Sequence, residues 1–483
     1  MNKKSFALLA LMSASAVNIH AANVAELKGN VPEEKATASV APEEQTANDE
    51  KSDDKGIGKI NYEPIDLDTD NGVVSLAGSK GFTIQTKKGD FIFKPYMLVQ
   101  TSANFNWYDD EGLDKAYNQD NVSNSGFAIP NAILGFTGKA FNKVTFNLSL
   151  NAAKTGGYLL QQAWFDVKFN NPVQVRVGKF KTPFSHAYLT TLGETLFPQL
   201  PTSLTTSTIM PYVLNAVTPS ISTGFDLGVE LHGVVNNKFG YEVGLFNGTG
   251  AAVNSATKTF SDDWHIPSLL YAGRLTYMPW GPIHSPQGNP KMLHDKKMLV
   301  GLSGSMNVES ENESTNDARM GLEFAMLLHR WYFAAEAYWM NVGFTKRQKI
   351  SEHYNYLGGY LQGGYFITPQ VQLAARYDFM NRNSTSKDGF LNMPAVGVNY
   401  FFKNCNLKLQ GMYQYTGRKG HATQLDRDND NLGLATHSAT VQLQYYFYPH
   451  AHNVHLAISN ETNHLCATTL CNASLLMRRR AYC

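Results

Sequence analysis

The sequence lacks the long apolar runs, the surplus of charge and the cysteine pattern that mark several protein classes. No run approaches the roughly 20 consecutive apolar residues that a membrane-spanning helix needs. Lysine and arginine (41) balance aspartate and glutamate (40), and charged residues make up 17% of the chain, below the roughly 25% of typical soluble proteins. The four cysteines show no zinc-site spacing. These absences exclude a helical membrane bundle, a basic nucleic-acid binder and a small disulfide-stapled domain, and we expect no metal or other cofactor.

In their place the sequence has an alternation of apolar and polar residues. In residues 439–447, for example, Val441, Leu443 and Tyr445 alternate with Gln442 and Gln444. A period of two residues is that of a β-strand with one apolar face. In an outer-membrane barrel the apolar face meets lipid and the polar face lines a water-filled lumen.

Sixteen runs with this alternation can be traced along the chain. They cover residues 91–107, 127–138, 143–151, 158–169, 173–181, 223–235, 239–246, 270–279, 297–308, 317–328, 331–344, 354–367, 369–380, 391–402, 406–416 and 437–448. The connections between them are alternately tight, as at 236–238, and long and polar, as at 417–436. The connection at 280–296 is long although it falls among the tight ones, and nothing in the sequence explains its length.

This alternation of loop lengths predicts an all-β fold, a transmembrane antiparallel β-barrel of about 16 strands. A soluble sandwich has no reason to alternate the lengths of its loops in this way. A secreted all-β adhesin is a further alternative, and it would partition into buffer and not into detergent.

The two ends of the chain differ from this middle part. Residues 1–22 have the pattern of a secretory signal peptide, with Lys3 and Lys4 before a short apolar core. Residues 23–60 are predicted to be an acidic, disordered periplasmic linker, because acids outnumber lysines and large apolar side chains are almost absent. The barrel is predicted to span residues 61–448, and residues 449–483 form a tail whose role is unknown.

Several segments resemble one protein family. Residues 173–184 read VQVRVGKFKTPF, and GFDLGVELHG at 224–233, YEVGLFNGTG at 241–250 and LAARYDFMN at 373–381 follow in the family's order. Over about residues 91–448 the chain resembles the phosphate-selective porin O and P family. The resemblance implies a sixteen-stranded porin in the lipid of the bacterial outer membrane, typically a homotrimer. It also implies that lysines and arginines lining the pore select phosphate or polyphosphate.

One departure from the family lies on the second strand. Many members carry an Arg-Arg-Ala run there, whereas this chain has Pro130, Asn131 and Ala132. The second strand therefore gives no support to a phosphate preference.

The alternation also assigns charged side chains to the lumen. The bases on the polar faces are Lys94, Lys168, Arg176, Arg274, Arg376 and Lys408, and the acids are Asp166, Asp226, Glu230, Glu242, Glu323, Glu336 and Asp378. Because the two signs nearly balance, most of these residues are expected to pair across strands and to carry no selectivity.

The start of the long connection at 182–222 is the exception. This connection contains five prolines and a single acid, Glu194, and it is too long for an ordinary loop. We expect it to fold into the pore, with Lys179, Lys181 and Arg176 attracting anions at the constriction. The alternative, in which these lysines merely lie at the rim, is equally open.

The predicted function is passive diffusion of small hydrophilic ions and solutes across the bacterial outer membrane, with anion or phosphate selectivity as a finer expectation. The chain is predicted not to be an enzyme, since no nucleophile-elbow motif occurs, and no nucleic-acid partner is expected. The alternative is an outer-membrane barrel enzyme or a specific binding protein, which a hydrolase assay on the folded protein could reveal.

Overall fold

The computed structural model describes residues 73–78, 81–108, 123–205, 224–248, 254, 267–283, 287, 296–308, 315–344, 354–381, 390–419 and 436–447. All of them belong to the compact unit formed by residues 70–483. The predicted signal peptide (1–22), linker (23–60) and tail (449–483) lie outside the described residues and stay predictions. Among the described residues, no helix is long and apolar enough to cross a membrane.

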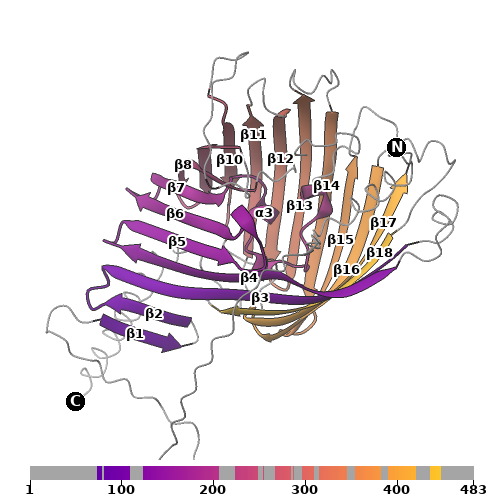
Figure 1. Ribbon diagram of the computed structural model, residues 1–483, viewed down its shortest axis with the longest axis horizontal. Helices are drawn as coiled ribbons and strands as arrows, with labels where there is room; N and C mark the ends of the chain where they lie inside the picture. The colour runs from indigo at the N-terminus through magenta and orange to yellow at the C-terminus, as the bar shows by residue number, and fades with distance from the viewer. Residues whose placement is uncertain are drawn as a thin grey trace, which may run out of the picture. The chain divides into compact units, whose positions relative to one another are not determined.

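Sixteen antiparallel strands form a closed barrel (Figure 1). They are β3 (Phe91–Tyr108), β4 (Asn124–Ala140), β5 (Val144–Asn151), β6 (Leu160–Lys168), β7 (Gln174–Lys181), β8 (Phe225–Val235), β9 (Phe239–Phe246), β10 (Leu270–Tyr277), β11 (Lys296–Asn307), β12 (Thr315–Leu328), β13 (Trp331–Phe344), β14 (Tyr354–Phe366), β15 (Val371–Asn381), β16 (Phe390–Lys403), β17 (Leu407–Lys419) and β18 (Thr436–Phe447). Each strand pairs with the next, and β18 pairs with β3 to close the ring. The predicted barrel of about 16 strands is confirmed, and each predicted strand coincides with an observed one to within a few residues.

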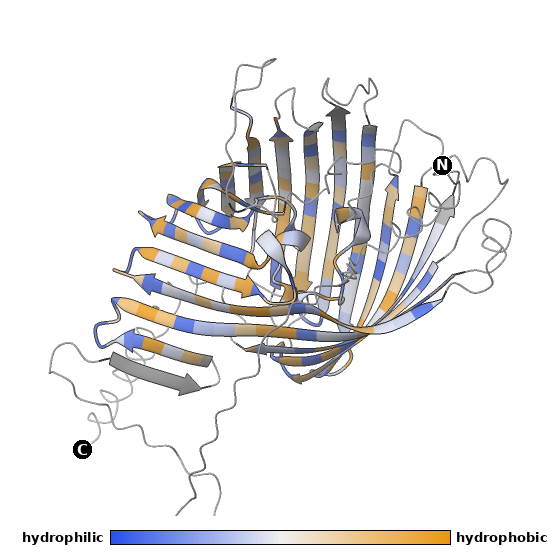
Figure 2. Cartoon of the chain, in the orientation of Figure 1, coloured by the Kyte–Doolittle hydropathy of each residue, from blue (hydrophilic) through white to orange (hydrophobic). Residues whose placement is uncertain are grey.

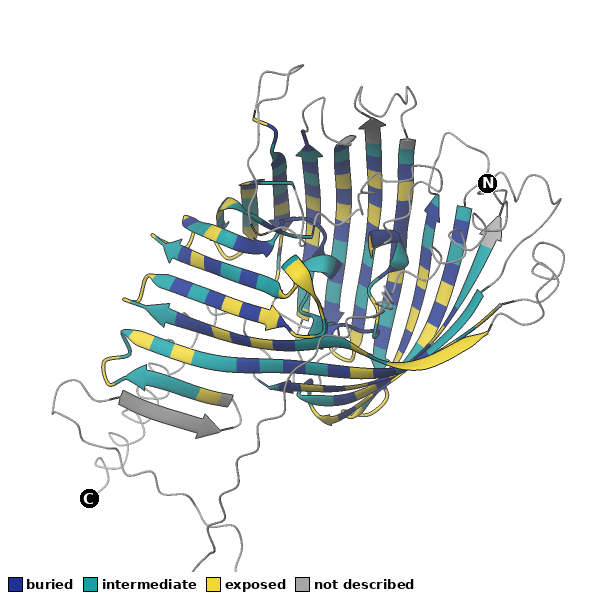
Figure 3. Cartoon of the chain, in the orientation of Figure 1, coloured by how far each residue is buried: buried dark blue, intermediate teal, exposed yellow. Residues whose placement is uncertain are grey.

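Side chains alternate between a buried, largely polar inner face and an exposed apolar outer face (Figures 2 and 3). On β18, Gln442 and Gln444 are buried, whereas Val441 and Leu443 are each 46% exposed. This distribution is the reverse of that in a soluble protein, and it suits an outer wall in lipid around a polar lumen.

The tight turns at one end of the barrel confirm the short connections read from the sequence. In the turn between β8 and β9, Asn236 and Asn237 both have positive φ angles, 52° and 54°. Two successive left-handed residues are the signature of a type I′ hairpin turn, whose twist matches that of the strands, and asparagine tolerates this conformation better than most residues.

A hairpin that the sequence analysis did not predict precedes the barrel. Strands β1 (Val73–Gly78) and β2 (Gly81–Thr86) pair with each other, and β2 pairs with β3 at Ile92 and Phe93. Because β18 pairs only with residues 97–108 of β3, the start of this long strand would otherwise have a free edge. Each of these two strands has six residues, too few to show a clear alternation.

Candidate functional site

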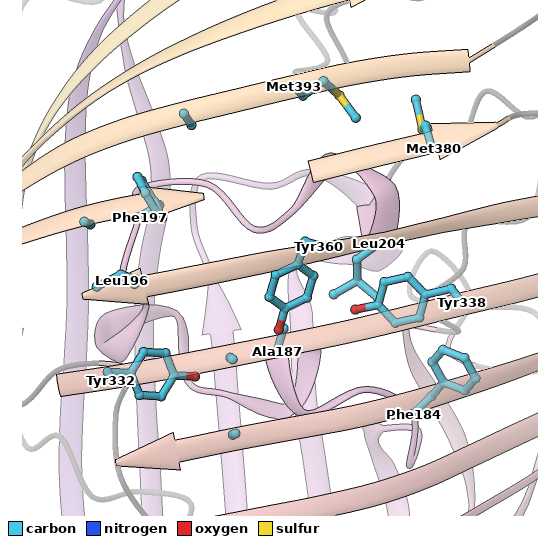
Figure 4. Packing of buried hydrophobic residues seen from close by; sticks show 14 of the residues in the cluster. Phe184, Ala187, Leu196, Phe197, Leu204, Tyr332, Tyr338, Tyr360, Met380 and Met393 are labelled. Atoms are coloured by element: carbon cyan, nitrogen blue, oxygen red, sulfur yellow. The ribbon is translucent and has the colours of Figure 1, made fainter. Parts of the chain in front are cut away.

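A loop between β7 and β8 packs against the inner wall of the barrel, as predicted. Its described part, residues 182–205, is called the inserted loop below, and it contains the short helices α3 (His186–Leu189), η2 (Leu192–Glu194) and α4 (Thr202–Thr205). Its apolar side chains and those of β13 to β16 form one buried cluster, which includes Phe184, Ala187, Leu196, Phe197, Leu204, Tyr332, Tyr338, Tyr360, Met380 and Met393 (Figure 4). A smaller buried cluster of Tyr96, Leu98, Ile133 and Tyr446 packs against Leu192 of the same loop.

The wall leaves room for this loop through a glycine on β16. A Cβ atom at Gly397 would lie 2.9 Å from a ring carbon of Phe197. Any larger residue at this position would therefore push the Phe197 ring away from the wall.

Polar side chains of the wall bind the carbonyl groups of the inserted loop. Lys408 donates to the Thr195 carbonyl at 3.0 Å, and Arg376 donates to the Gln199 carbonyl at 2.8 Å. Further donors of this kind are Gln444 to the Gly193 carbonyl (2.8 Å) and Asn399 to the Leu196 carbonyl (2.9 Å). Carbonyl groups without helix or sheet partners are thereby satisfied inside the barrel.

Two wall carboxylates bind backbone N–H groups of the same loop. Glu336 accepts from Ala187 at 2.7 Å. Asp378 accepts from Thr202 at 2.5 Å and from Ser203 at 3.3 Å. Thr202 begins α4, so Asp378 caps a helix whose first N–H groups have no partner within the helix.

On β6 to β12 the lumen carries a row of ion pairs. Arg176 contacts Asp166 at 2.9 Å and Glu230 at 3.3 Å. Further along the row, Arg274 contacts Glu323 at 2.8 Å. The strand register produces the Arg176 pairs, because Arg176 lies opposite both Asp166 on β6 and Glu230 on β8. Cross-strand pairing was expected for most lumen charges, Arg376 among them. Arg176 and Arg274 pair in this way. Arg376 instead donates to the Gln199 carbonyl and to Gln414 Oε1.

A cavity of about 300 Å³ separates this charged wall from the inserted loop. Arg176, Lys181 and Arg274 line it from the wall, and His186 and Glu194 line it from the loop. Unlike the two arginines, Lys181 donates to neutral groups, the carbonyls of Tyr188 (2.5 Å) and Thr190 (3.0 Å). Its charge is therefore the one that these contacts do not balance with an acid.

The two titratable residues that the loop adds to the cavity are both uncharged near neutral pH. Burial raises the pKa of the Glu194 carboxyl to about 8, although the nearby Lys408 opposes the rise. Burial, together with the positive charge of Arg274, lowers the pKa of His186 to about 4. The charge of the cavity at neutral pH thus comes from the strands.

The structure brings Arg176 and Lys181 into one cavity but does not place Lys179 on its lining. The Lys179 amine is buried and donates to the Gly157 carbonyl (3.1 Å) and to Asn254 Oδ1 (2.6 Å). Of the predicted wall residues, Arg274 lines the cavity, whereas Arg376 and Lys408 hold the inserted loop. The attraction of anions by any of these residues stays a prediction.

Neutral amides are the residues that the sequence reasoning missed. Gln444 and Asn399 hold the loop as firmly as the charged residues do, and so does Gln410, which donates to the Leu196 carbonyl at 3.2 Å. The available signal was the repeated glutamine on the polar faces of β17 and β18, but an amide that faces water gives the same pattern.

Basic residues gather at the end of the barrel that carries the tight turns. We consider each tight turn together with the two strand residues on either side of it. Among the described residues at these positions, Asp90 is the only acid, and the other charged side chains are lysines and arginines. The basic ones are Lys87, Lys88, Lys139, Lys143, Lys168, Lys238, Lys296, Lys297, Arg330, Lys403 and Lys408. Lys139 and Lys168 lie near enough to repel each other. Lys94, the remaining predicted wall residue, lies three residues into β3 from this end.

A family model matches most of the chain. Residues 99–447 match the model of the family described as phosphate-selective porin O and P. Among solved structures, the chain is similar to the outer membrane channel DcaP of Acinetobacter baumannii (12% identity, 77% of this chain and 100% of that chain, TM-score 0.47). It is also similar to an anion-selective porin from Comamonas acidovorans (10% identity, 74% and 100%, TM-score 0.46). No curated protein matches the chain.

Proposed function

The chain belongs to the phosphate-selective porin O and P family, and we propose that its pore favours small anions, with phosphate as the first anion to test. It is a porin of the bacterial outer membrane, a channel through which small hydrophilic solutes diffuse. The inserted loop narrows the lumen on one side, and the charged wall faces it across the cavity.

The placement of Lys181 on the cavity, together with the basic residues at the tight-turn end, carries the proposed preference. The carboxylates beside Arg176 and Arg274 offset their charges, whereas the partners of Lys181 are carbonyl groups. The basic residues at the tight-turn end add a positive potential at one mouth of the pore. Positive charge along a confined path raises the local concentration of anions and lowers that of cations. Of the three residues predicted at the constriction, we therefore assign the largest effect to Lys181, a smaller one to Arg176 and the smallest to Lys179.

The zero-current potential of single channels in a salt gradient tests this preference. Replacing Lys181 with Gln removes the charge of the protonated amine, worth about 1 kcal/mol at a partly screened site. At pH 6 the anion-to-cation permeability ratio should therefore fall severalfold, most strongly at low salt. Lys179→Gln is the matched control on the same strand and should have a much smaller effect. A wild-type channel that favours cations, or an equal effect of the two variants, would contradict the proposal.

The mouth is tested separately from the constriction. Lys139→Gln combined with Lys168→Gln should reduce the conductance of anions at low salt. The two changes should have little effect at 1 M salt, where the Debye length is only about 3 Å. Lys238→Gln combined with Lys403→Gln, one change in a turn and one at the end of β16, should have less effect.

We also propose that the protein is a homotrimer without catalytic activity, in keeping with the family's usual assembly and role. A trimer should migrate as a single large species on gels before boiling and dissociate on heating. A monomeric mass by light scattering in several mild detergents would contradict the proposed assembly.

We propose the domain boundaries read from the sequence as well: a signal peptide at 1–22, a periplasmic linker at 23–60, the barrel at 61–448 and a tail at 449–483. Protease treatment of the folded protein should remove the linker without loss of conductance.

A further inference from the structure

The connection between β10 and β11 lies among the tight turns but is long, and a residue from it reaches into the lumen. Gln287 belongs to this connection and is only 3% exposed. Pro282 and Ile283, from the start of the same connection, line the cavity, and Ile283 packs against the buried cluster of the inserted loop. The described residues 282, 283 and 287 of this connection therefore lie inside the barrel.

Gln287 makes hydrogen bonds to the inserted loop through its backbone and its side chain. Its N–H donates to the Glu194 carbonyl at 2.9 Å. Its Oε1 accepts from the Leu196 N–H at 3.2 Å and from Gln362 Nε2, on β14, at 3.0 Å. The side-chain oxygen of Gln287 thus joins the loop to the wall. The Nε2 atom of Gln287 lies 3.5 Å from the Thr190 hydroxyl.

The inserted loop is anchored differently on its two sides. The wall residues bind mainly the carbonyl groups of residues 192–199, whereas Gln287 accepts the N–H of Leu196. An N–H group that is buried without a partner is costly, so the loop can stay in this position only while an acceptor is present. Glu194 and Thr190, on the part of the loop that Gln287 touches, line the cavity. Any displacement of this part therefore changes the width of the passage.

We propose that Gln287 is a positioning residue for solute passage: it holds residues 190–196 of the inserted loop against the wall and so sets the cross-section of the pore. The inference rests on the channel function, and it adds a residue that does not itself discriminate between solutes by charge.

The test replaces Gln287 with Met, which keeps the size of the side chain but cannot accept the Leu196 N–H. Gln287→Glu keeps an acceptor oxygen in either protonation state. Gln174→Met is the control for hydrogen exchange, because Gln174 is also buried but donates to the Asn171 carbonyl in a turn and not to the inserted loop. Gln174 lines the cavity, so its current noise is not compared. Each purified protein is folded in detergent, and heat-modifiable migration on gels confirms that the barrel has formed.

Two measurements are then made on each protein: open-channel current noise in planar bilayers, and hydrogen exchange of the Leu196 amide by mass spectrometry. The population of displaced loop should rise about tenfold in Gln287→Met, as expected for the loss of a buried hydrogen bond. This larger population of displaced loop should raise both the current noise and the exchange rate of the Leu196 amide. Gln287→Glu should stay close to wild type in both measurements, and Gln174→Met should stay close to wild type in the exchange rate.

Unchanged noise and exchange in a folded Gln287→Met protein would overturn the proposal, and so would equal effects of the Met and Glu variants. If Gln287→Met does not fold, Gln362→Leu tests the same oxygen from the wall side. It should change both measurements in the same direction, and wild-type values there would overturn the inference. Hydrogen exchange does not depend on conductance, so it still decides the role of Gln287 if the wild-type protein forms no channels and the channel function itself fails.

Discussion

The cap that Asp378 places on α4 gives a quantitative prediction for the inserted loop. The carboxylate accepts a hydrogen bond of 2.5 Å from Thr202 and a weaker one of 3.3 Å from Ser203, and both Asp378 and Ser203 are fully buried. Hydrogen bonds to a charged group contribute about 1.5–3 kcal/mol each. We count one strong bond and one weak bond. Asp378→Ala should then destabilise the position of residues 202–205 against the wall by about 3 kcal/mol, which raises the population of loop displaced from the wall about 100-fold.

Hydrogen exchange of the peptide that contains residues 202–205, measured on detergent-folded protein, provides the assay. Asp378→Asn keeps one acceptor oxygen and should lose only about 1 kcal/mol. Asp317→Ala is the control, since Asp317 contacts Arg319 at 2.7 Å on its own strand and makes no contact with the inserted loop in the described part of the chain. The reasoning fails if Asp378→Ala folds to a heat-modifiable barrel and its loop exchanges within about twofold of wild type, because a buried cap cannot be lost at so small a cost.

Two further predictions concern the charged groups around the cavity. The pKa of the Glu194 carboxyl is raised from 4.5 to about 8 in the buried position. Its neutral form therefore stabilises the inserted loop in this position fully below about pH 4.5. That stabilisation is lost as the pH rises through about 8. After correction for the intrinsic rise of amide exchange with pH, hydrogen exchange of residues 190–196 should therefore accelerate over this window in the wild type and much less in Glu194→Gln; the same corrected pH dependence in both would contradict the assignment. Arg274→Met leaves the carboxylates of Glu323 and Glu242 without their cation, which should cost about 3–5 kcal/mol and lower the temperature at which the folded gel band disappears. Arg274→Lys should recover part of this loss, and a Met variant as heat-resistant as wild type would show that the row of ion pairs adds nothing to stability.

The barrel was predictable from the sequence because its physics is local. A strand between lipid and water must alternate, and residues 331–344 were predicted with the same bounds that the structure gives to β13. The insertion of residues 182–205 was predictable for a related reason: Leu196 and Phe197 are apolar side chains in a loop too long to stay at the rim. Both features depend on the residue types of one short segment.

The partners of the lumen residues were less predictable, because alternation tells which face a side chain occupies but not what lies opposite. Lys408 and Arg176 have the same sequence signature, yet one binds a loop carbonyl and the other lies between two carboxylates. Gln287 could not be recognised at all, since its partners Leu196 and Gln362 are about 75 or more residues away in the sequence and only the three-dimensional fold brings them together.

The closure of the ring between β18 and β3 has a consequence for the order in which the protein can assemble. Gln100 on β3 and Gln444 on β18 are 344 residues apart, yet their side chains are hydrogen-bonded at 2.9 Å, and both donate to neighbouring carbonyls of the inserted loop, Leu192 and Gly193. A sheet that lacks β18 cannot offer both donors. The hydrogen bonds that hold this part of the inserted loop are therefore complete only after β18 has paired with β3. During biogenesis the passage should therefore narrow last, after β18 has paired with β3, and a chain truncated before residue 436 should keep Leu192 and Gly193 accessible to periplasmic chaperones and proteases.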